Sequence, residues 1–183
     1  MLIRVIDFET TGMPPNAAVC EVGWCDLVGT LADQTTGLMS WSVSAPKAML
    51  VNPNRPMPPE ARAIHHIGDA DLVGAPEIAN GFMALADGKP TAYAAHNAAF
   101  EKEFFSGGEA AWICTLKAGR RLWPECPSHT NQCLRYFLGI ELEDGLALPP
   151  HRAGPDAYVT AHVLASALEK ASVEDLIAWT QQP

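Results

Sequence analysis

The first residues that could carry chemistry are two acids at the end of an apolar run. Residues 2–6 are mostly strand formers, and Asp7 and Glu9 come at the end of that run. Strand side chains at positions i and i+2 point to the same face, so both carboxylates are expected in one place. Such a pair repels unless a shared proton or a cation relieves it, and hard cations prefer oxygen ligands. Alone, the pair indicates a metal site no more strongly than two solvated acids before a Thr-Gly turn.

Two later segments add acids and a histidine. Residues 93–101 end in Glu101, near the start of an expected helix, and residues 151–157 place His151 five positions before Asp156. Pro155 and Asp156 also suit a helix N-terminus, where the helix dipole favours an acid. We interpret residues 152–155 as a loop, so His151 would lie on a mobile segment that settles when substrate binds.

The order of these segments is more informative than any one of them. Residues 7–12, 93–101 and 151–157 resemble the three motifs of the DEDDh family of 3′→5′ exonucleases. Residues 63–67 are similar to the proofreading branch of that family, and residues 112–124 to its exonuclease X branch. The second motif usually ends in aspartate, whereas this chain has Glu101. The resemblance implies an α/β, RNase H-like fold with a mixed five-stranded sheet flanked by helices, and a single exonuclease domain over residues 1–183.

The resemblance also implies roles for individual residues. His151 would be the general base, since histidine can accept a proton near neutral pH. Four acids would bind two Mg²⁺ or Mn²⁺ ions: Asp7, Glu9, Glu101 and Asp156. Contacts to nucleic acid are implied for seven further residues: Thr10, Thr11, Gly12, Met13, His65, Asn97 and Phe100. For Met13 and Phe100, packing in the core is an equally good explanation.

The composition is globular, with a surplus of acids. Of the 183 residues, 48% are hydrophobic and 18% charged, and the formal net charge is −9. That charge argues against a protein that coats long nucleic acid, because phosphate binding relies on basic surface, but not against one that grips a few terminal nucleotides. Three cations, Lys117, Arg120 and Arg121, fall on one expected helix and are equally well explained as a solvated face.

The cysteines and the apolar segments bear on the cellular compartment. Five cysteines without a secretion signal predict reduced thiols in a cytoplasmic protein, and no uncharged apolar run is long enough to cross a membrane. Cys126, His129 and Cys133 have the composition of an incomplete zinc site, but their spacing fits no common zinc finger.

Strands are expected first and helices later, which is typical of an α/β domain. The expected strands are 2–8, 19–28, a third that is split between 38–43 and 49–51, 91–95 and 112–114. A short helix is expected to start near residue 60. The other expected helices cover 76–86, 98–105, 115–123, 130–138, 156–170 and 173–180.

Three functions follow from this pattern. The leading hypothesis is a metal-dependent exonuclease that removes nucleotides from 3′ ends of DNA, most simply single-stranded DNA. One alternative is an exoribonuclease that trims RNA 3′ ends. The other is a weakly active nucleic-acid-binding module associated with a polymerase, suggested by Glu101 in place of aspartate. A polymerase partner and a homodimer both remain open.

Overall fold

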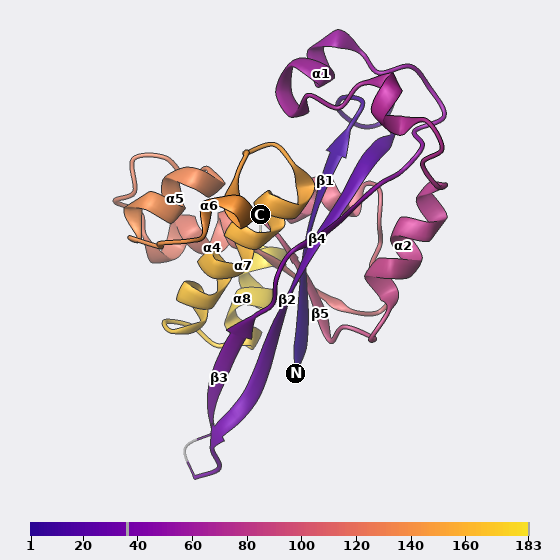
Figure 1. Cartoon of the computed structure of the whole chain (residues 1–183). Helices are drawn as coiled ribbons and strands as arrows, with labels where there is room; N and C mark the ends of the chain where they lie inside the picture. Colours follow the sequence, from indigo (N-terminus) through magenta and orange to yellow (C-terminus); the bar gives the residue numbers. More distant parts are fainter. Residues whose placement is uncertain (36, 183) are drawn as a thin grey trace.

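The computed structural model describes residues 1–35 and 37–182 and is organised around one mixed sheet (Figure 1). The main path of the sheet has the order β3-β2-β1-β5-β6, and β4 pairs with β2 off this path. The described strands are β1 Leu2–Thr10, β2 Val19–Asp33, β3 Leu38–Val43, β4 Lys47–Leu50, β5 Ala92–Ala95 and β6 Ala111–Cys114. β1 and β2 are antiparallel, whereas β1, β5 and β6 run parallel.

The sheet has six described strands rather than the five predicted, because the third is divided. β2 is 15 residues long, and β3 pairs with its far half, residues 27–33. β4 pairs with its near half, residues 21–24. The split between two candidate strands was therefore correct. β2, predicted to end at residue 28, continues as far as Asp33.

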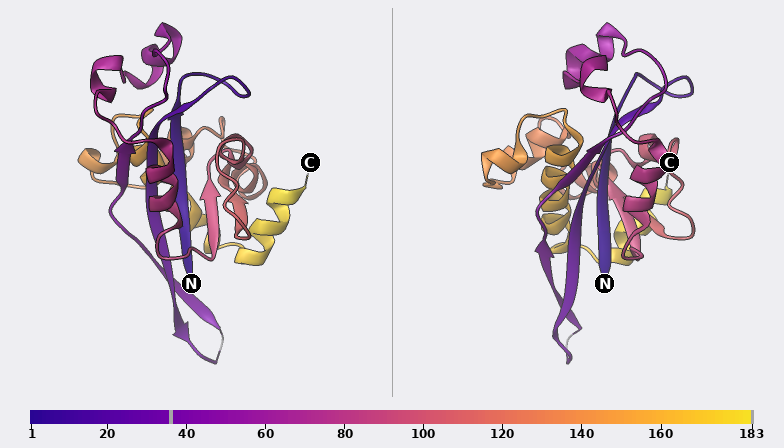
Figure 2. Two further views of the ribbon diagram at one scale, coloured as in Figure 1. Left: turned by 90° about the vertical axis from the view of Figure 1, so that its right-hand side faces the viewer. Right: turned by 45° about the vertical axis from the view of Figure 1, so that its right-hand side comes forward.

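Helices cover both faces of the sheet (Figure 2). α7 packs with α4, α5 and α8 against Ile3, Val5 and Leu27 on one face. α2 packs against Ile6 and Phe8 on the other face. The described helices are α1 Pro59–His65, the 3₁₀ helix η1 Asp69–Leu72, α2 Ile78–Ala86, α3 Ala98–Lys102, α4 Thr115–Leu122, α5 Asn131–Phe137, α6 Asp144–Ala147, α7 Ala153–Leu168 and α8 Val173–Gln181.

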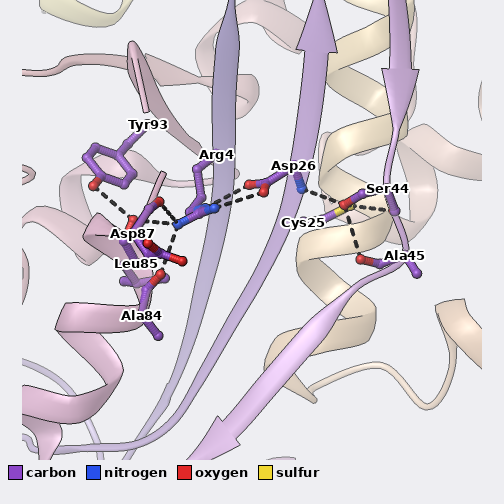
Figure 3. A network of polar contacts seen from close by, with 9 residues as sticks. All are labelled: Arg4, Cys25, Asp26, Ser44, Ala45, Ala84, Leu85, Asp87 and Tyr93. Carbon is purple, nitrogen blue, oxygen red and sulfur yellow. Dashed lines mark hydrogen bonds and ion pairs between the residues drawn. The ribbon is translucent and has the colours of Figure 1, made fainter. Parts of the chain in front are cut away.

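A buried arginine joins β1 to its neighbours on the α2 face (Figure 3). The Arg4 guanidinium donates two hydrogen bonds, of 2.7 and 2.8 Å, to the Asp26 carboxylate on β2. Its third nitrogen donates to the backbone carbonyls of Ala84, Leu85 and Asp87 at the end of α2. Even-numbered residues of β1 thus face α2, which leaves Asp7 and Glu9 on the face of α7.

The predicted start of the last long helix was wrong. Residues 152–155 were interpreted as a loop, but α7 begins at Ala153 and contains Pro155 in its first turn. Proline is tolerated there because the first backbone N–H groups of a helix have no partner within the helix. The short elements η1 and α6 were not predicted. Within the described part of the chain, no helix combines the length and apolar character needed to span a membrane.

Candidate active site

Three carboxylates from two distant parts of the chain meet at the end of β1. Asp7 and Glu9 project from β1, and Asp156 lies in the first turn of α7. One carboxylate oxygen from each lies within 4.8 Å of the other two. The structure therefore brings together residues separated by almost 150 positions in sequence. Among the described residues, no comparable set includes Cys126, His129 and Cys133.

His151 adjoins this cluster through its backbone. Its N–H donates a 2.8 Å hydrogen bond to Oδ2 of Asp156, and its side chain is exposed. The backbone of His151 has φ 60°, in the left-handed region that few non-glycine residues adopt. The N-terminal end of α5 also supports Asp156, because the Asn131 side-chain amide donates to the Asp156 backbone carbonyl at 3.0 Å.

The fourth predicted acid, Glu101, is buried at α3. Its side chain is 4% exposed, and its Oε2 has no hydrogen-bond partner within the described part of the chain. Burial raises the pKa of Glu101 to about 8. A buried carboxylate oxygen without a donor is costly, so this atom indicates a partner that protein groups alone do not supply.

Burial and mutual repulsion raise the pKa values of the acids above their ordinary values. Burial, followed by the charges of Asp156 and Glu101, raises the pKa of Asp7 well above its usual value. Burial and the Asp156 charge raise the pKa of Glu9 to about 8, although the Arg152 charge opposes the shift. A divalent cation would relieve both effects, and an all-carboxylate set suits a hard ion such as Mg²⁺. The residues present therefore fit a metal site.

A fifth acid, Glu21, anchors α7 to the sheet and was not singled out from the sequence. Glu21 lies opposite Glu9 in the β1–β2 ladder and is almost fully buried. Its carboxylate accepts hydrogen bonds from Arg152 Nη2 at 2.5 Å, from Arg152 Nε at 3.0 Å and from the Ala153 backbone N–H at 2.9 Å. An acid inside an apolar strand was the available signal, but only the pairing register shows what it contacts.

Two glycines let α7 approach the sheet closely. A Cβ atom added at Gly23 of β2 would lie 2.1 Å from the backbone carbonyl carbon of Ala153. A Cβ added at Gly154 would lie 3.3 Å from the side chain of Ala48 on β4. The first turn of α7 therefore rests on the strand backbone itself. This contact sets the height of Asp156 above the sheet.

Three of the residues predicted to contact substrate line one cavity. Met13, Asn97 and Phe100 surround a volume of about 380 Å³ together with Pro14, Pro15 and Glu103. Met13 is 74% exposed, so its side chain is not part of the core. Phe100 is half-buried and packs against Phe104 with ring centroids 5.3 Å apart. Both explanations of Phe100, core packing and a cavity wall, therefore apply.

The predicted contacts at the end of β1 are engaged within the protein. The Thr10 hydroxyl donates to the Gly12 carbonyl at 2.6 Å, and the Thr11 hydroxyl accepts the Ala18 N–H at 3.0 Å. Gly12 has φ 142°, which glycine adopts easily, and it is partly exposed. These bonds shape the turn after β1 and leave the Gly12 backbone accessible.

The prediction that His65 lines a substrate cleft was wrong. His65 is 2% exposed, and its Nδ1 accepts a 3.0 Å hydrogen bond from the Ile67 N–H. Its Nε2 therefore carries the proton and lies 3.3 Å from the Thr10 carbonyl oxygen. Burial lowers the pKa of His65, which keeps the ring neutral. With both nitrogens occupied, the ring supports the backbone of β1 and has no atom free for a phosphate.

A second cavity, of about 480 Å³, opens directly onto the acids. Its lining includes Asp7, Asp156, His151, His96 and Arg120. It shares no lining residue with the cavity around Met13. The acids thus border an open space large enough for a small organic ligand.

The fold and the acidic cluster define a class of protein, and the comparison with known families agrees. Residues 5–164 match the family described as "RNase_T: Exonuclease". The chain therefore belongs to the exonuclease family of hydrolases, and its type is the DEDDh 3′→5′ exonuclease.

Individual proteins within this family can also be compared with the chain. The chain is 31% identical to Exodeoxyribonuclease 10 of Escherichia coli strain K12 over 163 residues, which cover 89% of this chain and 67% of the relative. The solved structure of exonuclease X in complex with 5′ overhanging duplex DNA has a TM-score of 0.81 and 29% identity, covering 97% of this chain and 99% of that one. The nuclease domain of 3′hExo, a DEDDh family member bound to rAMP, shares the fold with a TM-score of 0.66 at 16% identity, over 93% and 92% of the two chains.

Proposed function

We propose that this protein is a metal-dependent exonuclease that hydrolyses phosphodiester bonds at the 3′ ends of DNA. The observation that carries the proposal is the convergence of Asp7, Glu9 and Asp156 within 4.8 Å, together with a buried Glu101 oxygen that has no hydrogen-bond partner among the described residues. In this proposal, these four acids hold two Mg²⁺ or Mn²⁺ ions, which supply the charge that stabilises the attacking and leaving oxygens.

His151 acts as the general base in this proposal. Its side chain is exposed beside the acids, while its backbone is held by Asp156 through the 2.8 Å hydrogen bond. The imidazole accepts a proton from the water that attacks the terminal phosphodiester, and the 3′ oxygen of the shortened strand leaves. Because the backbone is fixed and the ring is free, the base can turn toward the reacting phosphate without moving Asp156.

The terminal nucleotide occupies the cavity around Met13, Asn97 and Phe100. An exposed methionine and a phenylalanine ring provide the apolar surface on which a base can stack, and stacking tolerates every base. The accessible Gly12 backbone lies at the start of the turn that carries Met13 and is the proposed contact for the sugar. Such a site takes the end of a strand rather than reading a sequence.

DNA is favoured over RNA because the 31% identical relative is an exodeoxyribonuclease. The fold neighbour bound to rAMP is too distant in sequence, at 16% identity, to support an RNA substrate. We further propose that residues 1–183 act as one exonuclease domain in the cytoplasm.

The proposal is tested with 5′-labelled oligonucleotides. Single-stranded DNA should shorten by one nucleotide at a time in Mg²⁺ or Mn²⁺, with nucleoside 5′-monophosphates as products, and excess chelator should stop the reaction. Matched RNA and duplex DNA should be digested more slowly. If RNA is digested faster than DNA, the exoribonuclease alternative replaces the proposal. Digestion that continues in chelator would reject the metal-dependent site.

Glu101 should be required, but its length should matter less than its charge. Glutamate places its carboxylate about 1.5 Å farther from the backbone than aspartate does. We expect Glu101→Ala to lower activity about 10–100-fold, and Glu101→Asp to cost clearly less, with partial rescue by Mn²⁺. The measurement is kcat on single-stranded DNA across a metal titration. If Glu101→Ala digests DNA as fast as the parent protein, Glu101 holds no ion.

Glu21→Gln should slow hydrolysis through the position of α7. The amide keeps the size of the side chain but loses the second acceptor for Arg152, so the start of α7 is held less firmly. We expect about a 10-fold lower kcat and a melting temperature lower by about 3–12 °C, from the loss of about 1.5–3 kcal/mol in hydrogen bonds to a charged group.

Asp26→Asn is the matched control for Glu21. Asp26 lies on the same strand and binds Arg4 through two hydrogen bonds, on the face away from the acids. This variant should lose stability to a similar extent but keep its kcat at temperatures where it is folded. Equal losses of kcat in the two variants would mean that Glu21 acts on stability alone.

A further inference from the structure

We propose that Arg120 binds the first phosphate on the 5′ side of the scissile one, so that the cavity it lines receives the remaining strand. The inference rests on the proposed exonuclease function and adds to it a subsite for the polymer. It starts from the charges around the 480 Å³ cavity, where Asp7 and Asp156 face the same space as Arg120. Among its lining residues, Arg120 is the lone lysine or arginine.

The neighbouring cations are already occupied. Arg121, the next residue, donates to the Gln182 side chain and lies over the Trp179 ring, with 5.2 Å from its guanidinium carbon to the ring centroid. Lys117 donates to the backbone carbonyls of Thr180 and Gln182. Arg120, by contrast, is exposed and forms no ion pair with any described carboxylate. Its guanidinium is free for an outside anion.

The rest of the cavity adds hydrogen-bonding groups but no further free cation. His96, another lining residue, contacts Thr115 Oγ1 at 3.0 Å and the His129 carbonyl at 2.8 Å, so it contributes no free charge. Ser128 and Thr130 add hydroxyl groups to the lining. A guanidinium presents paired donors that match two phosphate oxygens. In a chain of net charge −9, this cation provides a local attraction for a nucleic acid strand.

The cavity has room for one nucleotide of the strand. A volume of about 480 Å³ lies in the range that holds one drug-sized molecule, and a nucleotide is of that size. Asp7 and Asp156 line the same cavity as Arg120. In the proposed function the acids hold the scissile phosphate through the ions, which leaves the next phosphate of the strand for the guanidinium. The terminal base occupies the separate cavity around Met13, which shares no lining residue with this one.

The experiment compares Arg120→Ala with Arg121→Ala. Both variants remove one exposed arginine from α4, so they change the net charge equally. On a single-stranded oligodeoxynucleotide with Mg²⁺, Arg120→Ala should lower kcat/KM about 10–100-fold, the loss expected for a hydrogen bond to a charged group. Arg121→Ala should lower it less than about 3-fold, because the effect of general charge is small. Equal losses in the two variants would overturn the assignment.

Two further substrates assign the phosphate. An oligonucleotide with one uncharged methylphosphonate, placed immediately 5′ of the scissile phosphate, should be a poor substrate for the parent protein. Arg120→Ala should add no further loss on it, because the interacting pair has already been broken. Thymidine 5′-(p-nitrophenyl phosphate) has no second phosphate, so the parent protein and Arg120→Ala should hydrolyse it equally.

The same substrates separate failure of this inference from failure of the proposed function. If the parent protein hydrolyses neither the oligonucleotide nor the nitrophenyl ester, the exonuclease proposal itself fails. If it hydrolyses both, and the methylphosphonate and Arg120→Ala effects multiply, Arg120 does not bind this phosphate. Slower hydrolysis of the nitrophenyl ester by Arg120→Ala would show that the variant disturbs the acids instead.

Discussion

Asp7→Asn should abolish hydrolysis and at the same time stabilise the metal-free protein. The activity falls because Asp7 belongs to the acidic cluster that is proposed to hold the metal. Losing one ionic ligand of a catalytic metal removes several kcal/mol of charge stabilisation, which lowers the rate about 10³-fold or more. Asparagine has the same shape, so the fold is kept. The measurement is kcat on single-stranded DNA at saturating Mg²⁺.

The stability effect has the opposite sign and depends on pH. Burial and neighbouring charges raise the pKa of Asp7 well above its usual value and that of Glu9 to about 8, and burial raises the pKa of Glu101 to about 8. The folded protein therefore holds protons that the unfolded chain has released, so stability is highest at acidic pH and falls as the pH rises from about 4 to about 8. At pH 8 in chelator, Asp7→Asn removes the cost of burying a group that is ionised in the unfolded chain, and its melting temperature should exceed that of the parent by about 2–8 °C.

Metal titration provides the control for this first prediction. Mg²⁺ should raise the melting temperature of the parent protein, since an ion bound only to the folded state stabilises it. It should raise that of Asp7→Asn much less. A variant that is inactive but gains as much stability from Mg²⁺ as the parent would place Asp7 outside the metal site.

His151→Asn should slow hydrolysis by about 10²–10⁴-fold and leave metal binding intact. Asparagine is the suitable replacement because it tolerates the left-handed backbone that His151 adopts, with φ 60°. The His151 N–H that binds Asp156 belongs to the backbone and survives the substitution. The loss should therefore come from the missing imidazole alone. The measurements are kcat and the Mg²⁺-dependent rise in melting temperature, which should match that of the parent.

His66→Asn is the matched control for His151. His66 is also exposed and also left-handed, with φ 62°, but it lies at the end of α1 and lines none of the described cavities. The same substitution there should change activity less than about 2-fold, as expected for a surface position. If the two variants are equally active, the general base is another group and the assignment of His151 must be withdrawn.

The sequence predicts this site to the extent that local periodicity and motif order determine it. Alternation along β1 correctly placed Asp7 and Glu9 on one face, and the order of three motifs correctly predicted that Asp156 would join them. The α/β, RNase H-like fold is confirmed, with six strands among the described residues in place of five. These features depend on residues close together in the sequence or on the similarity of the whole chain to a known family.

What the sequence did not show depends on contacts between distant segments. Glu21 has an obvious role only once the ladder places it beside Glu9 and α7 brings Arg152 to it. His65 matched a family motif, yet its nitrogens are occupied by Thr10 and Ile67, which no spacing rule predicts. The start of α7 was missed for the same reason: the Ala153 N–H that a loop would expose to water is bound by Glu21.

The contact between Gly23 and Ala153 has a consequence for how this chain can vary. Because a single added methyl group would lie 2.1 Å from the helix backbone, no rotation of a side chain can make room for it. Substitution of Gly23 is therefore prevented by the close packing of α7 on β2, although glycine has no side chain that could take part in the reaction. A library randomised at this codon and selected only for folding should recover glycine almost alone. Neutral substitutions must then accumulate at other positions, such as the exposed end of the β2–β3 hairpin. The spacing between the acids on β1 and Asp156 on α7 is kept as a result.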